Sequence, residues 1–257
     1  MNMRATKTTR PSIATEAFSE LGVATDKFEQ YPNPHAPRIA ALADEMARRL
    51  RLAEHDRRSL RTAALLHDLG EAAMERDYIK RSDELVDEDR IDLARHPVIG
   101  EQEAARAGAD RAAQLLVRWH HEWWNGSGYP DALRGEEIPL AARILRVADS
   151  YAALTDARPF RKALTAEQAR QKVIEWTGIE FDPRVVNLFL TLEDMPELES
   201  FARSEESPTA EGVSRDWDLF SSPKSNVQRP KSDRQPTCGL DVAAGHFTLD
   251  FGRWTLD

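Results

Sequence analysis

Two adjacent histidines stand at the end of an apolar helical pattern, and a glycine-rich loop follows them at once. They are His120 and His121 in the run WHHEWWNGSGYP, which ends at Pro130. Neighbouring residues of an α-helix point about 100° apart, so the two imidazoles can reach one centre only where the helix ends. Imidazole nitrogens are common ligands of metal ions. The pair therefore predicts a metal site that needs further ligands from elsewhere in the chain.

Further histidines and aspartates lie at expected helix ends or on faces that should be buried. His67 and Asp68 fall on the inner face of an apolar helical run, where a carboxylate is costly unless it is paired or metal-bound. His96 precedes Pro97, which breaks a helix at that point. Asp149 stands inside an apolar helical run, where its helix propensity is poor. The candidate ligands are His35, His67, Asp68, His96, His120, His121 and Asp149.

Each member of this set also has an ordinary structural interpretation. His35 can cap a helix or lie on the surface, His67 and Asp68 can form a structural hydrogen bond, and Asp149 can face solvent. Taken together, imidazole and carboxylate ligands without thiolate suit iron, manganese, nickel or zinc. They exceed the needs of one ion and suit two ions about 3.5–4 Å apart that share a carboxylate and a hydroxide. The set as a whole favours a binuclear site for phosphoester hydrolysis.

The elements that would position these groups are all helical. Ser59 is a candidate N-cap for the helix that ends in the His–Asp pair, and Gly70 is its candidate C-terminal stop. Pro139 suits the start of a long helix, Thr165 opens a capping box, and Asp182 caps the last helix. No stretch has the alternation typical of a strand. The sequence predicts an all-α bundle of about seven to nine helices.

Composition divides the chain into three parts and limits the function classes. Residues 1–27 form an N-terminal segment with a short helix, 28–197 the domain, and 198–257 a low-complexity tail expected to be disordered. The net charge of −9 argues against a binder of polymeric nucleic acid or of membrane surfaces. The single cysteine, Cys238, excludes an intramolecular disulfide. Because no membrane-spanning run or signal peptide is evident, we expect a cytoplasmic protein.

Three motifs resemble those of the HD-GYP family, a branch of the HD-domain phosphohydrolases. They are AALLHDLGE with His67 and Asp68, ARHPVIGE with His96, and the long run HHEWWNGSGYPDALRGEEIPL. His96 follows His67 by 29 residues (96 − 67), as in the family pattern. The resemblance covers roughly residues 28–193, and the third motif is highly specific to the family.

The resemblance implies an HD-domain helical bundle that binds two or three divalent ions and cleaves cyclic di-GMP in bacterial signalling. It implies that a hydroxide bridging two iron or manganese ions opens one phosphodiester to give linear pGpG, with further hydrolysis to GMP left open. One ion is expected to be held by His35, His67, Asp68 and Asp149. The other is expected to be held by His96, His120 and His121, with Asp68 bridging. The expected substrate contacts are Tyr129, Arg158, Arg161 and Lys162.

Three positions depart from the family pattern. Glu71 replaces the lysine that usually faces the scissile phosphate, which weakens charge stabilisation unless Lys80 or Arg81 reaches in. Glu71 can also serve as an additional metal ligand. Ala152 stands where an aspartate is common. Tyr31 occupies the place of a glutamate found in members with three ions, so we expect two ions here.

The leading hypothesis is a cyclic di-GMP phosphodiesterase in which Asp68 and Glu71 are the residues closest to the chemistry. The alternative is a catalytically weakened domain that acts as a cyclic di-GMP receptor or protein-interaction module. A hydrolase acting on another nucleotide is a third reading. A second copy of the chain or a signalling protein is the expected macromolecular partner, while the basic trio at 158–162 can also be an ordinary solvated loop.

Overall fold

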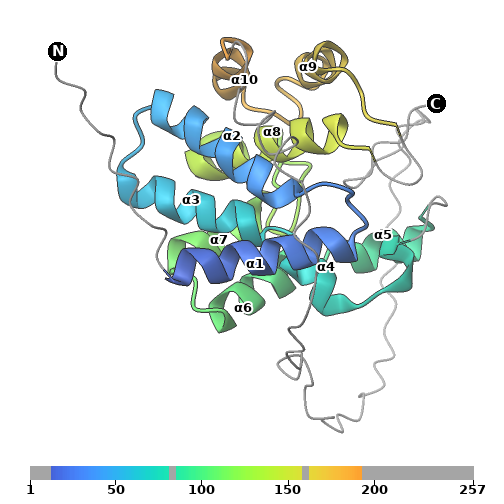
Figure 1. Cartoon of the computed structure of the whole chain (residues 1–257). Coiled ribbons are helices and arrows are strands. Elements are labelled where there is room, and N and C mark those ends of the chain that lie inside the picture. Colours follow the sequence, from blue (N-terminus) through green and yellow to red (C-terminus); the bar gives the residue numbers. More distant parts are fainter. Residues whose placement is uncertain (1–12, 81–84, 158–161, 193–257) are drawn as a thin grey trace, which may run out of the picture.

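The computed structural model describes residues 13–80, 85–157 and 162–192 (Figure 1). In chain order the elements are α1 (Ile13–Phe28), α2 (His35–Arg49), α3 (Glu54–Leu66), α4 (Leu69–Met74), η1 (Asp77–Lys80), α5 (Asp87–Leu93), α6 (His96–Arg106), α7 (Arg111–Trp119), η2 (Gly135–Glu137), α8 (Leu140–Thr155), α9 (Ala166–Glu175) and α10 (Pro183–Leu190). Eight of the α-helices have eight or more residues, whereas α4 has six and α5 has seven.

The predicted all-α class and the predicted number of helices are confirmed. Within the described ranges, the β-type pairing is limited to an isolated bridge between Thr177 and Phe181. No helix in those ranges combines the length and the apolar character that crossing a membrane requires. The predicted disordered tail, 198–257, lies outside the described residues.

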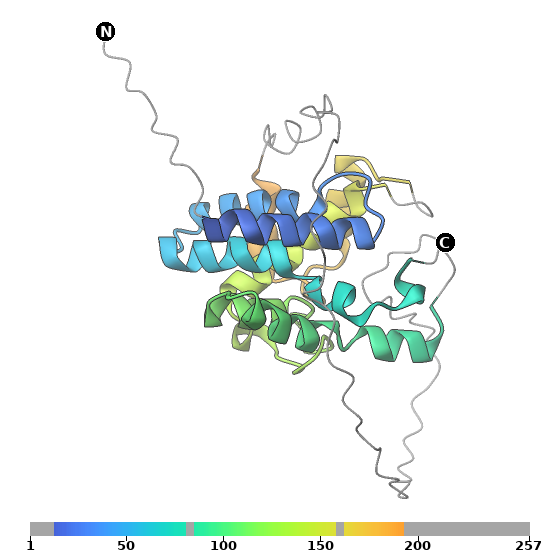
Figure 2. The ribbon, with the colours of Figure 1, turned by 60° about the horizontal axis from the view of Figure 1, so that its bottom comes forward.

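The helices form two layers, with α1, α2 and α3 in one and α6 and α7 in the other (Figure 2). Helices α1, α2 and α3 pack side by side, so the helix expected in the N-terminal segment belongs to the same bundle. On the other side of α3, α7 packs against it, and α6 packs against both α4 and α7. Helix α8 contacts α2, α3 and α7, while α9 and α10 cover its remaining side. Because α8 is enclosed, its side chains are apolar around most of its circumference.

One continuous apolar core holds these helices together. It is built from the inner faces of α2, α3, α7, α8 and α10, with fully buried side chains such as Ile39, Leu60, Ile144 and Phe189. The caps predicted for the last two helices are confirmed. Thr165 and Gln168 form a reciprocal capping box at α9, and the Asp182 carboxylate accepts the Arg184 N–H at α10.

Two local predictions for the helix before the His–Asp pair were wrong. Helix α3 begins at Glu54, one turn before Ser59, and the Ser59 hydroxyl instead donates to the Asp110 carboxylate at 3.0 Å. Gly70 does not stop a helix but lies inside α4. A Cβ added there would lie 2.0 Å from the His96 carbonyl oxygen, so glycine permits α4 to approach α6. That close approach places the His67–Asp68 pair beside His96.

Candidate metal centre

Six of the seven predicted ligands lie at helix ends, where side chains from different helices can converge. His35 and His96 are the first residues of α2 and α6, while His67 and His120 are the C-caps of α3 and α7. Asp149 alone lies within a helix, on the inner side of α8. All five histidines are at most 6% exposed and Asp149 is 8% exposed. The surface interpretation of His35 and the solvent-facing interpretation of Asp149 are therefore wrong.

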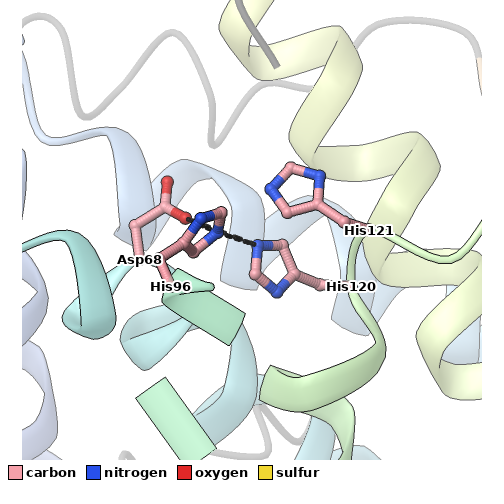
Figure 3. A group of neighbouring side chains, drawn as sticks. All are labelled: Asp68, His96, His120 and His121. Atoms are coloured by element: carbon pink, nitrogen blue, oxygen red, sulfur yellow. Dashed lines mark hydrogen bonds and ion pairs between the residues drawn. The ribbon is translucent and has the colours of Figure 1, made fainter. Parts of the chain in front are cut away.

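The seven side chains form two groups that could each hold an ion. We call Asp68, His96, His120 and His121 the His121 group (Figure 3), and His35, His67 and Asp149 the Asp149 group. The potential ligand atoms of each group lie within 4.8 Å of one another. Asp68 faces both groups, because its Oδ1 lies 3.3 Å from His96 Nε2 and its Oδ2 lies 2.9 Å from His67 Nε2. This placement agrees with the bridging role that the resemblance implies for Asp68.

Four imidazole rings are oriented by acceptors behind them. The Nδ1 atoms of His67, His96 and His120 lie 2.6–3.0 Å from backbone carbonyl oxygens three residues earlier. Since a carbonyl only accepts, each Nδ1 must carry a proton, so in the neutral ring the Nε2 lone pair is directed at the centre. The fourth ring, His35, donates its Nδ1 proton to the Asp156 carboxylate at 2.8 Å. Such outer contacts are typical of histidines that bind metal ions.

Buried polar atoms without hydrogen-bond partners provide a direct test of fit. The Nε2 atoms of His35 and His67 and the Oδ1 atom of Asp68 are buried and make no hydrogen bond within the described structure, and their polar neighbours are other candidate ligands, such as Asp68 Oδ2 at 2.9 Å from His67 Nε2. A buried polar atom without a partner is costly, and a bound ion would satisfy all three. The donor set of nitrogen and carboxylate oxygen suits iron, manganese or zinc. The residues therefore fit the metal centre predicted from the sequence.

Electrostatics favour the charged carboxylates that ion binding requires. Burial alone would raise the pKa of Asp149, but the His35 and His67 imidazoles that face it lower the pKa to about 2. Burial likewise opposes ionisation of Asp68, yet the surrounding histidines hold its pKa well below the ordinary value. For His67, burial is outweighed by the Asp68 charge, which raises its pKa to about 10. Both carboxylates thus remain ionised, with compensating positive charge on His67 in the metal-free chain.

Two side chains that the sequence did not single out, together with Tyr31, hold the candidate ligands in place. Asp26, at the end of α1, accepts the backbone N–H groups of His35 and Ala36 at 2.7 and 3.1 Å, where Pro34 offers no side-chain cap. Asp156 links His35 to Arg38. The Tyr31 ring stacks on the His35 ring at 3.9 Å between centroids. Neither Asp26 nor Asp156 belongs to a local motif with metal-ligand spacing, so only the tertiary fold reveals these two.

Glu71 lies beside the centre and belongs to a third group of potential ligands. It joins Glu29 and Asp68 in a cluster whose oxygens lie within 4.8 Å of one another, which we call the carboxylate group. Its Oε1 atom lies 3.9 Å from His96 Nδ1. Lys80, which was expected as a replacement cation, has its ammonium 4.1 Å from the centre of the Phe28 ring. Glu29 was missed in the sequence because it precedes His35 by six residues rather than four (35 − 29).

The loop after the adjacent histidines is anchored directly to the centre. The Tyr129 ring stacks on the His121 ring at 4.8 Å, and the Tyr129 N–H donates to the His121 carbonyl. The buried Glu122 carboxylate accepts the backbone N–H groups of Asp131 and Leu133 at 2.7 and 2.9 Å. The peptide bond between Tyr129 and Pro130 is cis. This arrangement holds the Tyr129 ring next to the ligands.

The basic trio expected to contact substrate is only partly described. Lys162 is exposed on the segment after α8, whereas Arg158 and Arg161 lie outside the described residues. Their roles stay predictions.

Comparison with known proteins identifies the same family as the motifs. The chain is 36% identical over 178 residues to the cyclic di-GMP phosphodiesterase response regulator RpfG of Xanthomonas campestris, covering 68% of this chain and 47% of the relative. It is 37% identical over 141 residues to a cyclic di-GMP phosphodiesterase of Vibrio cholerae, covering 51% of this chain and 28% of the relative. The chain therefore spans less than half the length of these two relatives.

A solved structure shows the same fold. A cyclic GMP-AMP-specific phosphodiesterase of V. cholerae superimposes with a TM-score of 0.59 at 22% identity, over 73% of this chain and 50% of that one. A family model described as HD domain matches residues 23–185, which include all seven candidate ligands from His35 to Asp149. The chain thus belongs to the HD-domain family.

Proposed function

We propose that the chain is a metal-dependent phosphodiesterase that hydrolyses cyclic di-GMP to linear pGpG, with GMP as a further product to be tested. The observation that carries this proposal is the pair of ligand groups that Asp68 faces, one of which lies against Tyr129. Asp68 faces His67 with one oxygen and His96 with the other. The relatives that are named cyclic di-GMP phosphodiesterases support the choice of substrate.

Two divalent ions, iron or manganese, are the proposed cofactors. When bound, they would lower the pKa of a water molecule and neutralise charge on the phosphate. The Asp149 group would hold one ion together with Asp68, and the His121 group would hold the other. The carboxylate group places Glu71 close enough to Asp68 to act as a further ligand, which we propose as its role in place of the usual lysine.

The remaining residues would bind and orient the cyclic dinucleotide. The Tyr129 ring, which stacks on His121 beside the ligands, is the proposed platform for a guanine base. Arg158, Arg161 and Lys162 are proposed to grip phosphate oxygens, since guanidinium and ammonium groups suit that task.

The second candidate function is a cyclic di-GMP receptor without turnover, and Glu71 favours it. A carboxylate beside the centre adds negative charge where a phosphate must lie, which opposes the transition state. Receptor function would retain ion and ligand binding while losing the chemical step.

Product analysis of the purified chain, loaded with Mn²⁺ or with Fe²⁺ in the absence of oxygen, tests the proposal. We expect pGpG from cyclic di-GMP and complete loss of turnover in Asp68→Ala. The matched control is Asp56→Ala on the surface of α3, with a side chain that is 48% exposed, and it should retain activity. Tight binding of cyclic di-GMP without turnover in any metal form would refute the enzyme and support the receptor. A 3′3′-cGAMP sample assayed in parallel tests the base preference.

A further inference from the structure

Arg146 is a buried cation that contacts a ligand of each ion group. It lies on α8 one turn before Asp149 and is only 4% exposed. Its Nε atom donates to the buried Glu180 carboxylate at 2.7 Å. The same guanidinium contacts Asp149 Oδ2 at 3.2 Å and His121 Nδ1 at 3.0 Å. Neither Arg146 nor Glu180 has a place in the proposed reaction, although both are costly to bury.

The contact with Asp149 supports ion binding at the Asp149 group. Arg146 takes one carboxylate oxygen, Oδ2, while Oδ1 lies 3.7 Å from His35 Nε2 and 3.8 Å from His67 Nε2. A hydrogen bond to the outer oxygen of a ligating carboxylate fixes the direction of the inner oxygen. Arg146 therefore orients Asp149 toward the two histidines that would share its ion.

The contact with His121 has the opposite effect. A guanidinium has donors and no acceptor, so His121 Nδ1 must accept from Arg146. The single proton of the neutral ring then sits on Nε2. Figure 3 shows that one ring nitrogen of His121 faces the other members of the group and that the second is turned toward α8. An ion at the His121 group requires a lone pair on that inner nitrogen, so it can bind only when the contact with Arg146 is broken.

The other four rings show the contrast. His67, His96 and His120 each place Nδ1 against a backbone carbonyl, and His35 places it against Asp156. Those acceptors hold the proton on the outer nitrogen and leave the inner one ready to bind. His121 is the one candidate ligand whose Nδ1 faces a cation among the described contacts.

We propose that Arg146 makes the two ion sites unequal, supporting the Asp149 group and weakening the His121 group. This inference deepens the proposed function and rests on it, because it concerns the two metal ions proposed there. An ion at the His121 group must break the hydrogen bond between Arg146 and His121, whereas an ion at the Asp149 group breaks none. Loss of this hydrogen bond to a charged group weakens ion binding at the His121 group about tenfold or more. The chain therefore binds its first ion at the Asp149 group and its second, more weakly, at the His121 group.

Equilibrium titration of the whole chain with Mn²⁺, with free Mn²⁺ measured by electron paramagnetic resonance, tests this ordering. We expect two classes of site that differ about tenfold or more in affinity. His121→Ala should remove the weaker class, and His35→Ala should remove the tighter one. Removal of the opposite classes would overturn the assignment, as would two sites of equal affinity in the native chain.

The double variant Arg146→Met with Glu180→Gln removes both buried charges, and it should bring the two affinities together by strengthening the weaker site about tenfold. Because that variant could fail to fold, Arg146→Lys provides a second test, since an ammonium keeps the Glu180 pair but lacks the guanidinium fork. The matched control is Arg143→Met, one turn earlier on α8, where Arg143 pairs with Asp182 at 2.6 Å. It should keep the native ratio.

The outcomes separate this inference from the proposed function. A folded Arg146 variant that keeps the native ratio of affinities would overturn the inference and leave the phosphodiesterase proposal intact. Unequal sites in a chain that never cleaves cyclic di-GMP would support the inference and refute the enzyme. A chain that binds no Mn²⁺ would overturn both.

Discussion

Replacing Asp156 by asparagine should weaken ion binding although Asp156 is not expected to touch an ion. Its carboxylate accepts from His35 Nδ1 at 2.8 Å with one oxygen and from Arg38 with the other. An asparagine has one oxygen for these two donors. If that oxygen faces Arg38, the amide N–H₂ faces His35 Nδ1 and moves the ring proton to Nε2, where it blocks the ion. If the oxygen faces His35, the amide N–H₂ group faces the Arg38 guanidinium, and both of these groups are donors.

The expected magnitude follows from these two outcomes. Either orientation loses a hydrogen bond to a charged group, which costs about 1.5–3 kcal/mol of stability in the metal-free chain. Loss of an outer contact to a ligating histidine typically weakens metal binding about 10- to 100-fold. Urea unfolding in the presence of a chelator measures the first quantity, and Mn²⁺ titration measures the second at the tighter class of site.

Asp182→Asn provides the matched control for this prediction. Asp182 is also a buried carboxylate paired with an arginine, Arg143, but its partners include no candidate ligand. It should lose comparable stability, because asparagine can still cap α10 but cannot form the ion pair. Its Mn²⁺ affinity should not change. If Asp156→Asn lost stability yet kept native Mn²⁺ affinity, Asp156 would be a structural residue only and the reasoning would be refuted.

Three further predictions follow from other contacts. Asp26→Ala should cost about 1–2 kcal/mol in urea unfolding, because two N–H groups at the start of α2 lose their acceptor; Asp26→Asn should recover part of this. Glu122→Gln should raise KM for cyclic di-GMP while Mn²⁺ affinity is kept, since one amide oxygen cannot hold both N–H groups of the Tyr129 loop. Because Asp68 raises the pKa of His67 to about 10, an ion must displace its proton, so Mn²⁺ affinity should rise up to about tenfold per pH unit between pH 6.5 and 9. The same raised pKa of His67 stabilises the metal-free fold below pH 6.5, and this stabilisation is lost as the pH rises toward 10. A metal-free chain whose free energy of unfolding increased between pH 6.5 and 10 would contradict this prediction.

The sequence allowed most of the candidate ligands to be predicted because they lie in short motifs with their own signals. Adjacent histidines at a helix end, a His–Asp pair on an apolar face and a histidine before proline all depend on local spacing. The helical class followed from the 3.6-residue periodicity, which is also local. Gly70 shows the limit of such reasoning. Its position suggested a helix stop, but its true role is to permit the contact between α4 and α6, which no local pattern records.

The supporting residues could not be predicted for the same reason. Asp156 contacts His35 across 121 residues of sequence, and Arg146 contacts His121 across 25. Asp26 precedes His35 by nine residues and reaches it only because α1 and α2 pack side by side. Each of these side chains is an ordinary surface or helix residue when considered alone. Their function depends on distances between helices, which spacing along the chain does not determine.

The charges around the centre indicate which step Glu71 should affect. The carboxylate group gathers negative charge on the side where the resembled family places a lysine, and this attracts ions while it repels a phosphate. Arg146 cannot replace that lysine, because it is buried and its guanidinium is already bound by Glu180. Under the proposed function, neutralisation of the phosphate would therefore fall to the proposed ions and to the basic trio that includes Lys162. It follows that Glu71 favours the binding of metal ions and limits the chemical step, so its effect belongs both in the affinity for Mn²⁺ and in kcat.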